Sequence, residues 1–156
     1  MNRSRRKMLK GTGGAAVIGL AMSAGLFRSS GAWAQGWNKG AFETKSMADT
    51  VKALGGATAV ESKDITIVSP DIAENGAVVP FSISSKIPNT QAIALLVEKN
   101  PNTLAASFTI PEGTEAGVTT RVKMGQTSNV TALVKADGKF YYTSKEVKVT
   151  LGGCGG

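Results

Sequence analysis

The sequence contains no histidine, and Cys154 is its single cysteine among 156 residues. Histidine is the commonest general base and metal ligand in proteins, so Ser-His-Asp and Cys-His catalysis are excluded within this chain. One cysteine cannot form an intrachain disulfide, and a zinc, haem or iron–sulfur site would need ligands from another chain. We therefore expect a protein that is not an enzyme and that holds no metal or cofactor of its own.

Acidic residues are absent from the first 34 positions, which hold six of the 18 basic residues of the chain. The remaining 12 basic residues face 11 acidic ones, so the rest of the chain is close to neutral. The formal net charge of +7 therefore comes from the N-terminus. This distribution argues against a nucleic-acid-binding surface.

Residues 1–34 have the organisation of a cleaved export signal. A basic stretch over residues 2–7 precedes an apolar run over residues 15–27, which is too short and too rich in glycine for a convincing membrane span. The small-x-small sequence at residues 32–34 predicts cleavage before Gln35. We expect no stable association with a membrane.

The basic stretch contains adjacent arginines, Arg5 and Arg6, and closely resembles the twin-arginine export pattern. The alternative is an ordinary Sec signal in which the two arginines are adjacent by chance. Twin-arginine export resembles a route for proteins that fold before they cross the membrane. We therefore expect periplasmic localisation and export in complex with a partner protein.

The first element expected after the signal is one short amphipathic helix over residues 40–54. Apolar residues recur there at spacings typical of one helical face, and Gly55-Gly56 predicts where the helix ends. The residues of this apolar stripe are Phe42, Met47, Val51 and Leu54.

After the helix, short apolar or alternating segments are separated by turn residues, which predicts seven or eight strands. Asp137-Gly138 between two such segments is the strongest hairpin signal. No βαβ alternation follows the helix, so the fold class expected for residues 35–151 is all-β, an immunoglobulin-like antiparallel β-sandwich, with a barrel as the alternative. The expected strands span residues 65–68, 77–84, 92–97, 104–110, 118–124, 130–134, 140–142 and 146–151.

The chain ends in a glycine-rich segment, residues 152–156, that holds the cysteine. Glycine adopts both signs of φ and chain ends are usually mobile, so this segment is expected to be a flexible arm. Its residues are Gly152, Gly153, Cys154, Gly155 and Gly156. A thiol on such an arm suits a carrier that is passed from one protein to another better than it suits catalysis in a fixed pocket.

The reactive form of Cys154 would be the thiolate. Lys145 and Lys148 could lower the pKa of the thiol, whereas the terminal carboxylate would raise it, and the sequence leaves this balance open. One alternative function is a stand-alone thiol redox protein, although the chain offers no resolving cysteine and no nearby base. The other is a structural subunit joined to a second chain by a disulfide through Cys154.

The terminal Gly-Gly-Cys-Gly-Gly sequence, behind a twin-arginine-like signal and a small sandwich, resembles the SoxY family of the periplasmic Sox thiosulfate-oxidising system. Three internal stretches, residues 69–80, 97–101 and 121–127, also resemble this family. The resemblance implies a swinging-arm carrier that holds S-thiosulfonate, persulfide and oxidised sulfur forms covalently on Cys154.

The same resemblance implies a set of partner proteins. SoxZ would form a heterodimer with the chain, and the haem protein SoxXA would couple thiosulfate to Cys154. SoxB would hydrolyse off sulfate, and SoxCD, where present, would oxidise the remaining sulfur. The glycines would give the arm a small cross-section, so that each enzyme can admit it into an active-site channel.

Overall fold

The computed structural model describes residues 38–150. The signal residues Arg5 and Arg6 and the arm residues Gly152, Gly153, Cys154, Gly155 and Gly156 lie outside the described residues. The chain divides into two compact units, Met1–Trp37 and Asn38–Gly156, and every described helix and strand belongs to the second.

Two short helices, α3 (Lys39–Phe42) and α4 (Met47–Ala53), occupy the region where one helix was expected. The prediction of a single helix is therefore wrong. Ser46 has an extended backbone and its Oγ accepts a hydrogen bond from the amide of Asp49 at 3.1 Å. A serine in this position caps the start of a new helix, so the two helices are separated.

The predicted end of the helical region at Gly55-Gly56 is confirmed. Gly55 has a φ of +88°, which is the left-handed conformation that glycine adopts without strain. Its amide donates to the carbonyl of Lys52, and the amide of Gly56 donates to the carbonyl of Val51 at 2.8 Å. This pair of hydrogen bonds is the Schellman arrangement that closes a helix.

Within residues 38–150, nine strands, where seven or eight were predicted, form two sheets, as expected for an immunoglobulin-like β-sandwich. The larger sheet has the order β1-β9-β8-β5-β6, with β3 also paired to β9, and the smaller has the order β2-β4-β7. The strands are β1 (Ala59–Glu61), β2 (Ile65–Val68), β3 (Ile72–Ala73), β4 (Val79–Ser85), β5 (Thr90–Val97), β6 (Leu104–Thr109), β7 (Gly117–Val122), β8 (Ser128–Ala136) and β9 (Lys139–Val149).

The last strand differs from the prediction. Residues 140–142 and 146–151 were expected to form separate strands, but β9 is continuous over 11 residues. It pairs with β8 on one side, and on the other it pairs in parallel with β1 and with β3. The predicted hairpin is confirmed, because Asp137 and Gly138 have positive φ values of 48° and 73° between β8 and β9.

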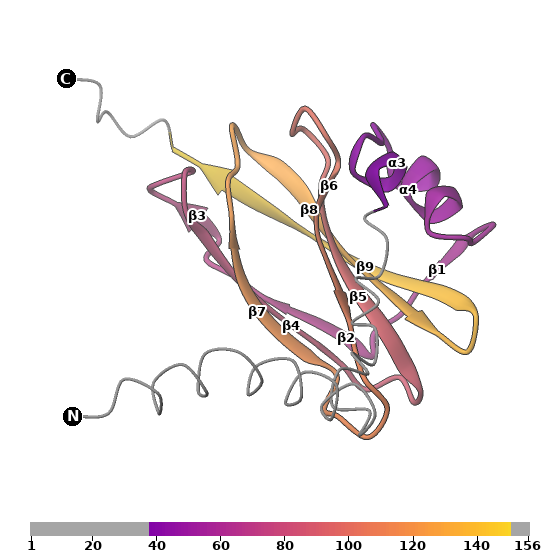
Figure 1. The fold of residues 1–156 in the computed structure, drawn as a ribbon. Helices are drawn as coiled ribbons and strands as arrows, with labels where there is room; N and C mark the ends of the chain where they lie inside the picture. The colour runs from indigo at the N-terminus through magenta and orange to yellow at the C-terminus, as the bar shows by residue number, and fades with distance from the viewer. Residues whose placement is uncertain (1–37, 151–156) are drawn as a thin grey trace, which may run out of the picture. The chain divides into compact units, whose positions relative to one another are not determined.

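The core lies between the two sheets, and a second apolar cluster lies between the larger sheet and the helices. Figure 1 shows α3 and α4 against the larger sheet, on the side away from β2, β4 and β7. Strand β5 contributes to both clusters: Ile93 and Leu95 face the smaller sheet, while Ala94 and Leu96 pack beneath the helices. Both faces of β5 are buried, which explains its nearly continuous apolar sequence.

Candidate functional site

Strand β9 ends at Val149, so the described residues that come just before the glycine segment in the sequence are at the C-terminal end of this strand (Figure 1). Thr150 is the last described residue, and we call it the arm root. Its amide donates to the carbonyl of Ala73 at 3.1 Å, and its Oγ1 donates to the same carbonyl at 3.4 Å. The amide of Val149 donates to Oγ1 of Thr127 at 3.0 Å. Two neighbouring segments therefore hold the arm root in place.

An ion pair fastens the segment before β3 to the same strand. The Nζ atom of Lys145 lies 2.8 Å from Oδ1 of Asp71 and donates to the carbonyl of Ser69 at 3.0 Å. The hydrogen bond and the positive charge of Lys145 hold the pKa of the Asp71 carboxyl below its usual value, because both favour the ionised form. The sequence left open whether Lys145 acts on Cys154; in the structure, the Lys145 ammonium group is bound to these two residues.

A glycine allows the turn after β3 to pack closely against Met124 and Val149. A Cβ atom on Gly76 would lie 2.4 Å from the carbonyl oxygen of Met124 and 2.7 Å from Cγ1 of Val149. The carbonyl of Gly76 also accepts a hydrogen bond from the amide of Met124 at 2.7 Å. The Asn75-Gly76 turn is present, and Oδ1 of Asn75 accepts from the amide of Ala77 at 2.9 Å. Sequence patterns predicted the turn but not the close contact.

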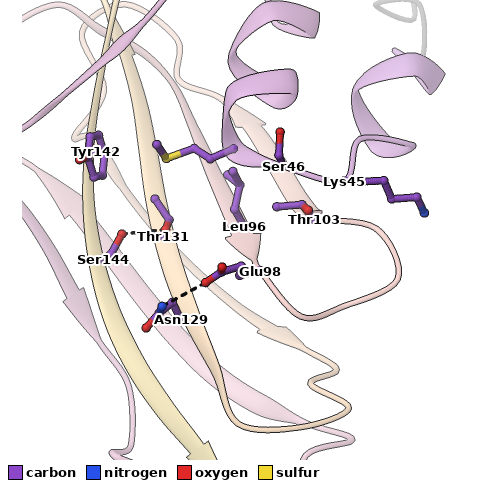
Figure 2. Close-up of a pocket in the computed structure, with 10 residues that line it drawn as sticks. Lys45, Ser46, Leu96, Glu98, Thr103, Asn129, Thr131, Tyr142 and Ser144 are labelled. Carbon is purple, nitrogen blue, oxygen red and sulfur yellow. Dashed lines mark hydrogen bonds between the residues drawn. The ribbon is translucent and has the colours of Figure 1, made fainter.

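A pocket of about 310 Å³ lies on the outer face of the larger sheet, beside the N-terminal end of α4. Figure 2 shows its lining side chains, which come from α4 and the residues before it and from β5, β8 and β9 with their adjoining loops. The lining residues are Lys45, Ser46, Met47, Leu96, Glu98, Thr103, Asn129, Thr131, Tyr142 and Ser144.

Two pairs of polar side chains in this pocket are bonded to each other, and the buried Oγ1 of Thr103 has no hydrogen-bond partner. Asn129 donates to Oε2 of Glu98 at 3.0 Å, and the hydroxyls of Thr131 and Ser144 lie 2.7 Å apart. The lining provides no cysteine and no histidine. Within residues 38–150, no group of three metal-ligating side chains is placed to hold a metal ion.

The region from Asn38 to Thr150 contains no helix that is long and apolar enough to cross a membrane. The structure is an immunoglobulin-like β-sandwich, and hydrogen bonds to Ala73 hold Thr150, the residue that follows its last strand. Comparison with known proteins identifies the family of this sandwich.

A family model described as "Sulfur oxidation protein SoxY" matches residues 51–154, a range that includes most of the described sandwich and ends at the cysteine. The sulfur carrier protein SoxY from Chlorobium limicola f thiosulfatophilum is 36% identical, with a TM-score of 0.60. That alignment covers 66% of this chain and 94% of the other. The chain belongs to the SoxY family of sulfur oxidation proteins, whose role is that of a sulfur carrier.

Other similarities are more remote. A superoxide reductase (neelaredoxin) from Ignicoccus hospitalis is 19% identical, with a TM-score of 0.49. That alignment covers 55% of this chain and 79% of the reductase. A search of curated proteins returned no match.

Proposed function

We propose that this protein is a periplasmic carrier that holds sulfur intermediates covalently on Cys154 during the oxidation of thiosulfate. The family match, which extends to the cysteine itself, is the observation that supports this proposal most strongly. The identity of 36% to a sulfur carrier protein supports it further. The thiol is the single sulfhydryl group of the chain, so a carrier function has one possible attachment atom.

The first step of the proposed cycle joins the sulfane sulfur of thiosulfate to the Cys154 thiolate. One S–S bond forms, and two electrons leave to the haem groups of SoxXA, which gives a cysteine S-thiosulfonate. SoxB then adds water across the bond to the sulfonate group, which releases sulfate and a proton and leaves a persulfide on Cys154. Where SoxCD is present, it removes six electrons from the outer sulfur while three waters supply the oxygens of a new sulfonate, and seven protons are released.

In this scheme, the chain contributes the Cys154 sulfur, to which the intermediates are attached, and positions it. The partner enzymes contribute the catalysis. The absence of histidine from the sequence supports this division, because the commonest general base is missing. The protein forms a heterodimer with SoxZ and reaches the periplasm by the twin-arginine pathway. Arg5 and Arg6 are the residues that the export machinery would recognise.

Replacement of the cysteine tests the attachment site. Wild-type protein incubated with thiosulfate and oxidised SoxXA is expected to gain the mass of a thiosulfonate, whereas Cys154→Ser gains none. The variant should retain the melting temperature of the wild type, because both core clusters consist of residues between Ala41 and Val149. Intact-protein mass spectrometry and thermal denaturation measure the two outcomes.

Two other results would contradict the proposal. A wild-type protein that stays unmodified in a mixture with active SoxXA would rule out covalent loading on this chain. A stable disulfide dimer through Cys154 as the sole species, with no sulfur adduct, would favour a structural subunit instead. Reduction with a phosphine before the incubation provides the control, since it ensures that the thiol is free in each sample.

A further inference from the structure

Three consecutive backbone amides at the end of β9 donate hydrogen bonds to alternate sides of the strand. The amides of Lys148 and Thr150 donate to backbone carbonyls within residues 71–73, on the side of β3. The amide of Val149, which lies between them, donates to Oγ1 of Thr127 at 3.0 Å. The first and third acceptors are backbone atoms, whereas the middle acceptor is a side-chain atom. A substitution of Thr127 can therefore remove one of these three bonds without any change in β9 itself.

The Thr127 hydroxyl takes the place of a backbone acceptor that β8 does not provide. The last pair of residues between β8 and β9 is Ser128 with Val147. The same register would place Gln126 opposite Val149, but β8 begins only at Ser128. The amide of Val149 thus lies beyond the ladder between these two strands. Because a backbone amide needs an acceptor when water is excluded, the hydroxyl extends the attachment of β9 by two residues.

The bend before β8 is itself attached to the neighbouring loop between β5 and β6. Ser128 is 2% exposed, and its Oγ accepts a hydrogen bond from the amide of Lys99 at 3.0 Å. Nδ2 of Asn100 donates to the carbonyl of Lys123 at 2.8 Å. These bonds fasten both ends of the bend over residues 123–128. The bend can therefore hold the end of β9 in place, since it does not move freely with the strand.

The end of β9 determines how many residues lie between the sheet and Cys154. Four residues lead from Thr150 to Cys154, and they span at most about 14 Å when fully extended. If the strand opened as far as Lys148, six residues would lead to the cysteine and the span would rise to about 21 Å. A longer tether lowers the effective concentration of the group that it carries, here by about twofold. The bond from Val149 to Thr127 opposes this opening.

We propose that Thr127 is a positioning residue for the carrier cysteine. Its hydroxyl holds the end of β9 on the side of β8, and it thereby fixes the point from which Cys154 is presented. Without that hydroxyl, the amides of residues 148–150 are held on the β3 side alone. This inference rests on the proposed function, because it assigns Thr127 a role in the loading of the cysteine.

Two substitutions separate the hydroxyl from the shape of the side chain. Thr127→Val removes the acceptor at nearly constant volume, whereas Thr127→Ser retains it. Amide hydrogen exchange, followed by NMR, should be at least about fivefold faster at Val149 in Thr127→Val and close to the wild-type rate in Thr127→Ser. Val134, which pairs with both β5 and β9 in the middle of β8, should keep its exchange rate in both variants.

The second measurement is the loading of Cys154 with thiosulfate by SoxXA, with the full chain in complex with its partner subunit. We expect kcat to fall about two- to threefold in Thr127→Val, and Thr127→Ser to restore it. The KM for the carrier complex should stay unchanged, because the substitution alters the delivery of the sulfur and not the binding of the enzyme. Alkylation of Cys154 by iodoacetamide requires no delivery to an enzyme, so its rate should be equal in all variants.

Thr119→Val is the matched control for the loss of a hydroxyl. Oγ1 of Thr119 lies 2.9 Å from Oγ of Ser82, so this threonine also joins two strands through its side chain. Both strands belong to the smaller sheet, whereas Val149 belongs to the larger one. We expect Thr119→Val to have wild-type exchange at Val149 and wild-type kcat.

Other outcomes overturn the inference. Wild-type kcat in Thr127→Val would remove Thr127 from the positioning of the cysteine, as would failure of Thr127→Ser to restore kcat or an equal fall in Thr119→Val. Exchange at Val134 that rises as much as exchange at Val149 would indicate a general loss of stability instead. If wild-type protein is alkylated but never loaded, the proposed function fails and the positioning role fails with it. If the wild type is loaded and only the Thr127 result is negative, the proposed function stands.

Discussion

At the scale of single residues, Gly76 holds the turn after β3 against the end of β9. Any side chain at this position would collide with the backbone of Met124 and with Val149, and backbone atoms cannot rotate away. Overpacking of this kind typically costs about 1–3 kcal/mol. The position is therefore restricted by packing, although its φ is not in the left-handed region.

We expect Gly76→Ala to lower the free energy of unfolding by about 1–3 kcal/mol, measured by urea denaturation. The matched control is Gly125→Ala in the loop that Gly76 contacts, because a Cβ atom on Gly125 would have no neighbour within 4 Å. That control should change stability by less than about 0.5 kcal/mol. Equal stability of Gly76→Ala and wild type would show that the turn moves away without cost.

The Asn75-Gly76 turn could be predicted from the sequence, whereas the contact of Gly76 with Met124 could not. Turn residues act on their own backbone, so they leave a local signature. The contacts of Gly76 join segments that are far apart in the chain, and no local pattern records them. Asp71 and Lys145 are also far apart in the sequence. No local pattern therefore indicated their ion pair or its effect on the charge near the arm root.

At the scale of elements, the two-residue strand β3 depends on its attachment to β9. The Asp71–Lys145 ion pair contributes to this attachment, and the pKa of Asp71 is lowered from 3.8 by it. Because the folded-state pKa is below the unfolded value, the ionised carboxylate stabilises the fold above pH 3.8. That contribution is lost as the pH falls through the folded-state pKa.

Asp71→Asn is therefore expected to have a slightly lower melting temperature than wild type at pH 7. The difference should shrink as the pH falls below 3.8 and disappear once the carboxyl is protonated in both states. The effect is small because the carboxylate is exposed to solvent, and added salt should reduce it. Glu74→Gln, which removes an exposed charge from the same segment, provides the control.

The sequence predicted well those elements in which apolar residues recur with a clear periodicity, in which both faces are buried, or in which a turn has characteristic residues. Strand β5 is an apolar run, and the β8–β9 hairpin has its Asp-Gly turn. Strands β1 and β3 have three and two residues, which is too short for a period to show. The polar residues Thr143 to Lys145 interrupt the apolar pattern of β9, yet pairing with β8 continues through them.

At the scale of the whole molecule, the sulfur carrier role makes the chain one component of an assembly. We expect the mature protein to be recovered from periplasm as a 1:1 complex with a second small subunit. Native mass spectrometry of the purified complex measures this stoichiometry. Recovery of the chain as a monomer under the same conditions, or solely as a disulfide-linked homodimer, would contradict the expectation.

The pairing of β9 has a consequence for the order in which the protein is made. β9 lies close to the C-terminal end of the sequence, yet β1, β3 and β8 all require it as a hydrogen-bonding neighbour. The larger sheet therefore cannot be completed until β9 has been synthesised, and pairings between distant residues such as Ala59 and Phe140 slow folding. A nascent chain truncated before β9 lacks the strand that completes this sheet. The hydrogen bonds that hold Thr150 to Ala73 therefore form only after β9 has been synthesised and has paired with its neighbours.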